Sequence, residues 1–143
     1  MTATQPTTIP PRTNWLLTLN AVLLALLVLN LVVFDDLRVD PSAGAIETFT
    51  KPAHLISILA VVASIVLLAI RHRSAVRVAT VVAWTEIAAF SLLHGLPWEV
   101  GPTKPYWGQG MGDLLQWIGF VAILACSAAI VSLPVHSRGR RYS

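Results

Sequence analysis

Four long apolar segments constrain what this 143-residue chain can fold into. They cover residues 14–34, 52–70, 75–94 and 113–133, each close to the ~20 residues that an α-helix needs to cross a bilayer. Backbone groups in hydrocarbon must satisfy their own hydrogen bonds, so each segment is expected to be a helix. The pattern predicts an all-α integral membrane protein in which four transmembrane helices form an antiparallel bundle.

The composition agrees with a chain that faces lipid. Hydrophobic residues make up 55% of it and charged residues 12%, about half the charged share of an average soluble domain. The net charge of +3 could indicate a nucleic-acid partner, but the basic residues flank the apolar segments, as a topology signal does. We therefore expect the lipid bilayer as a partner and no nucleic acid. The single cysteine, Cys126, excludes an intrachain disulfide.

The residues outside the apolar segments divide the chain into three parts. Residues 1–13 are polar and proline-rich and are expected to form a disordered tail. Residues 14–134 form the transmembrane domain, and residues 135–143 form a basic tail. The first apolar segment is longer than a signal-peptide core and lacks an A-x-A-like cleavage site. We therefore expect that segment to be retained as a span.

Charged residues are unevenly distributed among the connections. The first and third connections hold acidic residues, including Asp35, Asp36 and Glu99. The two tails and the stretch RHRSAVR, which is the second connection with the first residues of the third segment, hold no acidic residue and seven of the ten basic residues, namely Arg12, Arg71, Arg73, Arg77, Arg138, Arg140 and Arg141. By the positive-inside rule both termini lie in the cytoplasm. We expect a multi-pass protein of a bacterial-type cytoplasmic membrane.

Polar residues within a segment fall on one helical face. Asn20 and Asn30 share a face of the first segment, and His54, Ser57 and Ser64 share a face of the second. Polar groups avoid lipid, so these faces are expected to meet inside the bundle. There they would form either a functional site or ordinary hydrogen bonds between helices.

Glu86 is the one ionisable residue deep within an apolar segment, eight residues before His94. A charge at that depth is costly, so the carboxyl is expected to be protonated or paired. Asn30 and Gln116 are the simplest hydrogen-bonding partners for it. An ionisable residue inside a membrane is a candidate functional site. The alternative is a neutral carboxyl that only joins helices through hydrogen bonds.

His54 opens the second apolar segment and His94 closes the third. The short connection RHRS joins these segments, so the two imidazoles should lie at similar depth, near Asp113 and Glu99. Two histidines with carboxylates could bind zinc, copper or non-haem iron, and two facing histidines could ligate a haem. The chain has no H-E-x-x-H or H-x-x-x-H spacing to support either cofactor.

The third connection, HGLPWEVGPTKPYWGQGMGD, is rich in glycine and proline. Its prolines stiffen it, its glycines permit tight turns, and Asp113 is suited to N-cap the fourth helix. It lacks the GxxxxGK[ST] pattern, so phosphate binding by this loop is not expected. Trp98 and Trp107 belong either to the interfacial aromatic belt or to a cover over the end of the bundle. A ligand would be expected beneath this loop, toward Glu86.

Three functions agree with these features. The first is a binding or accessory subunit of a membrane complex, with a polar pocket on the outer side and partner subunits or further copies of the chain against its apolar surface. The second is a metal- or haem-binding redox protein that uses His54 and His94. The third is a proton-coupled small carrier with Glu86 as the proton site. No nucleophile–base pattern indicates a catalytic residue, so an enzyme is not expected.

Overall fold

The computed structural model describes residues 11–33, 45–95 and 112–139, and the side chains of residues 13–32, 52–95 and 114–133. These ranges contain four helices and no strand: α1 (Pro11–Val33), α2 (Ala45–Ala69), α3 (Ala75–His94) and α4 (Gly112–Gly139). Each helix includes an apolar stretch long enough to cross a membrane: Thr13–Val32, Pro52–Ala69, Ala75–His94 and Leu114–Leu133. The prediction of four helical segments of spanning length is confirmed.

Three helices extend beyond the predicted segments. α1 begins at Pro11, where the fixed φ of proline suits the first helical position, so the tail predicted over residues 1–13 overlaps the helix. α2 begins at Ala45, seven residues before the predicted start, and carries Pro52 in its interior. α4 continues to Gly139, into the predicted basic tail. Hydropathy marks the part of a helix that suits hydrocarbon, whereas the helix itself can continue into the polar interface.

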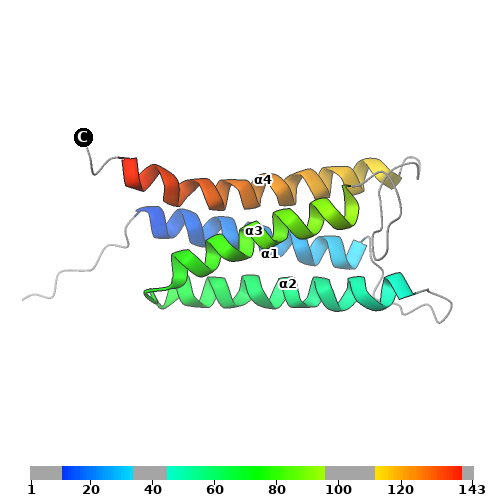
Figure 1. Cartoon of the computed structure of the whole chain (residues 1–143), viewed down its shortest axis with the longest axis horizontal. Coiled ribbons are helices and arrows are strands. Elements are labelled where there is room, and N and C mark those ends of the chain that lie inside the picture. The colour runs from blue at the N-terminus through cyan, green and yellow to red at the C-terminus, as the bar shows by residue number, and fades with distance from the viewer. Residues whose placement is uncertain (1–10, 34–44, 96–111, 140–143) are drawn as a thin grey trace, which may run out of the picture.

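The four helices form a bundle in which each helix packs against two others. α1 and α3 both pack against α2 and α4, and a minor contact joins α1 to α3. Figure 1 shows the helices side by side, with the start of α1, the α2–α3 connection and the end of α4 at one end of the bundle. We call this the turn end, defined by the connection at residues 70–74, and the opposite end, where α3 finishes, the far end.

Buried positions recur at spacings of three and four residues. In α3 they are Ala75, Ala79, Ala83, Glu86, Phe90 and His94, and in α1 they include Leu16, Asn20, Leu23, Leu27 and Asn30. This spacing is the heptad-like seam of bundles whose helices cross at about 20°. Three alanines at the turn end of α3 allow its neighbours to approach closely.

The outward faces of the bundle are apolar. Ile56, Leu59, Ile70, Val81 and Trp84 are all exposed large hydrophobic side chains. Several polar side chains are instead buried, among them Asn30, His54 and Glu86. This arrangement of apolar residues outside and polar residues inside suits a bundle surrounded by hydrocarbon, because lipid solvates the exterior and helix contacts shelter the polar groups.

A tight turn sets the antiparallel arrangement of α2 and α3. Arg71 adopts a left-handed conformation with φ 55°. The His72 N–H donates to the Leu67 carbonyl at 2.9 Å, and the Arg71 N–H donates to the Leu68 carbonyl at 3.2 Å. These two bonds form a Schellman motif, the capping arrangement that ends α2 at Ala69. The Ser74 N–H donates to His72 Nδ1 at 3.3 Å, so α3 begins immediately afterwards.

Candidate functional site

An aromatic and ionisable cluster lies between α2 and α3 toward the far end. The rings of His54 and His94 are stacked, with centroids 6.0 Å apart and planes inclined by 14°. Phe90 contacts both rings, at centroid distances of 5.6 Å from His54 and 5.3 Å from His94. The short α2–α3 turn thus brings the two imidazoles together at one depth, as the antiparallel arrangement predicts.

Glu86 lies one helical turn nearer the turn end than Phe90, on the same buried seam of α3. Its side chain is only 1% exposed. The carboxyl shares a hydrogen bond with the Ser57 side chain of α2, and His54 is close enough to act electrostatically on it. The other carboxyl oxygen, Oε2, has no hydrogen-bonding partner. The carboxyl therefore retains a free acceptor site that faces the bundle interior.

The partner of Glu86 differs from the sequence-based expectation. Asn30 was expected to bond the carboxyl, but both polar atoms of its side chain lack a partner. Gln116 was the alternative, but the side-chain hydrogen bond of the carboxyl is with Ser57. Ser57 takes this role because it lies on the α2 face that the tight turn aligns with Glu86. Across helices that are not consecutive, packing rather than sequence spacing sets the level of each side chain.

Asn30 and Gln116 lie at a common level nearer the far end. The Cys126 thiol donates to the Leu19 carbonyl at 3.2 Å and so fixes how α1 and α4 are aligned. Asn30 lies eleven residues after Leu19, and Gln116 lies ten residues before Cys126. Because α1 and α4 run in opposite directions, both amides lie about 16 Å from that contact toward the far end, at the usual helical rise. A buried amide without a protein partner is costly unless water or a ligand pairs with it.

Three further buried polar side chains occupy the half of the bundle toward the turn end. The Asn20 amide donates to the Leu16 carbonyl at 2.8 Å, which leaves its Oδ1 atom unpartnered. The hydroxyls of Ser64 and Ser127 also lack partners. Polar groups therefore recur along much of the bundle interior and are not confined to the histidine cluster.

A residue that the sequence reasoning did not single out is Phe90. It lies four residues after Glu86 and four before His94, so helical spacing alone places it on the same seam. Its ring packs between the carboxyl level and the two imidazoles. That i, i+4, i+8 spacing of Glu, Phe and His was the signal that could have indicated it.

The cluster is a poor fit for a metal or a haem. Within the described ranges, no three His, Cys, Asp or Glu side chains are grouped closely enough to hold a metal ion. A haem held by two histidines places its iron between two imidazole nitrogens, with the porphyrin separating the rings. His54 and His94 instead stack face to face with Phe90 against both. This stacked pair, with Phe90 in contact with both rings, does not have the arrangement of two axial haem ligands.

Several candidate residues lie where the structure gives little or no description. Trp98, Glu99 and Trp107 fall outside the described residues. Asp113 falls within α4, which begins at Gly112, and its side chain is outside the described set. Asp113, expected as the N-cap, lies one residue after the observed start of α4, and helix ends vary by one or two residues. An acidic residue in that first turn still suits the positive end of the helix dipole.

Comparisons with known proteins give no further assignment. The chain matches no family model, and searches of the curated proteins and the solved structures find no similar one.

Proposed function

We propose that this protein is a small proton-coupled carrier of a membrane, with Glu86 as the residue that binds the proton. The observation that carries the proposal is the buried carboxyl in the third spanning helix, 1% exposed and bonded to Ser57. Ionisable residues are rare inside membranes and usually mark a pathway for ions or protons. Among the described residues of the spanning segments, Glu86 faces no Lys or Arg that would make it half of an ion pair.

In this proposal each side chain near Glu86 has a separate role. Ser57 orients the carboxyl, while His54 and His94 relay protons between Glu86 and the far end. Histidine suits this task because its charge changes close to physiological pH. Phe90 holds both imidazoles in place. Asn30, whose amide has no protein partner, offers a donor and an acceptor to a small solute.

The membrane and orientation belong to the same proposal. We place the protein in a bacterial-type cytoplasmic membrane with both termini inside. The support is the distribution of arginines at the turn end, where Arg71, Arg73 and Arg77 lie and the positive-inside rule favours the cytoplasm. The histidines then lie on the outer side and Glu86 lies between them and the cytoplasm.

Proteoliposomes with a trapped pH-sensitive dye test the carrier directly. Under an imposed pH gradient, methylammonium, guanidinium and a set of small neutral amides would be supplied in turn as transport probes. We expect proton flux that depends on one of these probes, and we expect Glu86→Gln to abolish it. Glu47→Gln makes the same chemical change near the start of α2 and should leave the flux intact. Equal flux in wild type and Glu86→Gln would refute the assignment.

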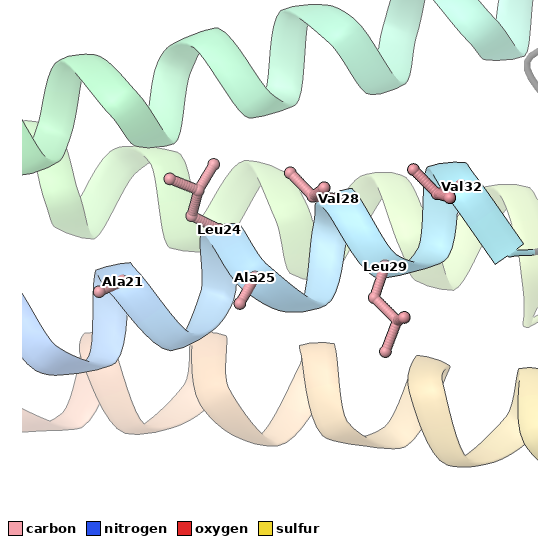
Figure 2. Close-up of a pocket in the computed structure, with 6 residues that line it drawn as sticks. All are labelled: Ala21, Leu24, Ala25, Val28, Leu29 and Val32. Carbon is pink, nitrogen blue, oxygen red and sulfur yellow. The ribbon is translucent and has the colours of Figure 1, made fainter.

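A second candidate is an accessory subunit, favoured by a groove on the outward face of α1. The groove has a volume of about 480 Å³ and an entirely apolar lining: Ala21, Leu24, Ala25, Val28, Leu29 and Val32. Figure 2 shows these side chains along α1, between α2 and α4. Ala21 and Ala25 are four residues apart, the small-residue spacing that allows close helix packing in membranes. A transmembrane helix of a partner subunit would fit here.

A photo-crosslinking amino acid at position 25, in the native membrane, separates this candidate from the carrier. A partner subunit should give one defined membrane-protein adduct. The same probe at Val81, which is exposed on α3, should give none. Crosslinks to lipid alone at both positions would exclude the accessory role and leave the carrier proposal unaffected.

A further inference from the structure

We propose that the α2–α3 turn is a binding site for the phosphate of an anionic phospholipid headgroup. Three arginines occupy seven consecutive residues here, Arg71, Arg73 and Arg77, and all three are exposed. Guanidinium groups bind phosphate oxygens through two parallel hydrogen bonds, so arginine suits this ligand better than lysine does. The proposal concerns the opposite half of the molecule from the histidine cluster and does not depend on Glu86.

No carboxylate competes for these arginines in the part of the chain that the structure describes. The acidic residues there are Glu47, Asp113 and the buried Glu86. Glu47 and Asp113 lie in the first turns of α2 and α4, at the far end of the bundle in Figure 1. Among the described residues the charged groups of the α2–α3 turn are therefore all basic, and an external anion would balance them.

The turn that carries the arginines is held by local hydrogen bonds. His72 Nδ1 and the Ser74 hydroxyl are 2.7 Å apart, within hydrogen-bonding distance. Arg71 stands at the left-handed position of the Schellman motif, with φ 55°. Glycine occupies that position most readily, because an L-residue is strained there. The chain nonetheless places an arginine at this corner, two residues before Arg73 and six before Arg77.

Apolar neighbours point to a lipid as the source of the phosphate. Ile70 is 65% exposed and directly precedes Arg71, and Val76 is 44% exposed and directly precedes Arg77. The turn also joins two helices of spanning length, so it lies where a spanning segment meets the headgroups. Exposed apolar side chains beside the arginines can contact the acyl chains of a lipid whose phosphate the guanidinium groups hold. Free phosphate would gain nothing from them.

Native mass spectrometry of the full chain, released from detergent, measures this preference. The probes are dioleoylphosphatidylglycerol and dioleoylphosphatidylcholine, each titrated separately and then in the presence of inorganic phosphate. We expect the anionic lipid to bind at least about tenfold more tightly than the zwitterionic one. Replacing Arg71, Arg73 and Arg77 together with glutamine should weaken binding of the anionic lipid about a hundredfold, since each basic residue near an anionic membrane contributes about fivefold.

Three controls keep the test decisive. Glutamine at Arg38, Lys51 and Lys104 removes the same net charge elsewhere and should preserve the preference. Lysine at the three turn positions keeps the charge but not the forked geometry, and should retain only part of the affinity. Arg73 lies in the turn between α2 and α3. Arg73→Gln alone should therefore leave the fold unchanged and weaken lipid binding about fivefold.

Three results would overturn the proposal. If the variant at Arg38, Lys51 and Lys104 loses as much affinity as the turn variant, only the overall charge matters. If inorganic phosphate displaces the anionic lipid at equal concentration, the site selects phosphate and not a lipid. Unchanged lipid binding by Arg73→Gln and by the triple glutamine variant would likewise exclude a site at the turn.

Discussion

Replacing Phe90 with alanine should destabilise the bundle by about 3 kcal/mol, the lower part of the range for buried aromatic truncations. Phe90 is 2% exposed and its ring contacts the imidazoles of His54 and His94. Two such ring contacts contribute about 0.5–1.5 kcal/mol each beyond simple burial. The remainder is lost packing around the vacated space. The lower part of the range applies because lipid solvates apolar groups almost as well as the bundle interior does.

Unfolding in mild detergent by increasing fractions of dodecyl sulfate, followed by circular dichroism, measures this free energy. Trp84→Ala is the matched control, because Trp84 lies on the same helix, is 56% exposed and faces outward. That substitution should change the unfolding free energy by less than about 0.5 kcal/mol. Phe90→Leu keeps an apolar side chain in the space but loses the two ring contacts, so it should cost less than Phe90→Ala and more than Trp84→Ala. Equal destabilisation by Phe90→Ala and Trp84→Ala would refute the packing of this cluster.

Three more predictions concern the seam, the turn and the orientation. Ala79→Leu should destabilise the bundle by about 1–3 kcal/mol in the same unfolding assay, because Ala79 is fully buried and a larger side chain would push α3 from its neighbours. An unchanged unfolding free energy would contradict the close packing of α3 against those helices. Arg71→Gly should raise the unfolding free energy by up to about 1 kcal/mol, since glycine relieves the left-handed strain, and a loss of stability would contradict the Schellman motif. In a Cys126→Ser background, Arg73→Cys should react with an impermeant maleimide only in inverted membrane vesicles and Lys104→Cys only in intact cells; the reverse pattern would contradict the proposed orientation.

The number and type of helices could be predicted from the sequence because they depend on local properties. Length and hydropathy identify four segments that can cross hydrocarbon, whatever their neighbours are. The proximity of His54 and His94 was also predictable, since a turn of a few residues fixes the alignment of α2 and α3. These features require no knowledge of how distant helices pack.

The partner of Glu86 and the ends of the helices could not be predicted from the sequence. Ser57 bonds the carboxyl instead of Asn30 because the rotation and level of α1 relative to α3 follow from the packing of the whole bundle. α2 starts at Ala45, on the N-terminal side of Pro52, because helical hydrogen bonding can continue outside the apolar segment. Asp113 was expected to cap α4 and lies one residue after its start, because helix ends fray by one or two residues.

The central claim is that the buried carboxyl of Glu86 binds and releases a proton inside the membrane. Infrared difference spectroscopy of the protein in lipid, recorded while the bulk pH is varied, reports this carboxyl directly. We expect a protonated-carboxyl band that changes with pH, is missing from Glu86→Gln and is retained in Glu47→Gln. A wild-type spectrum in which no such band changes with pH, or a band that persists in Glu86→Gln, would contradict the account.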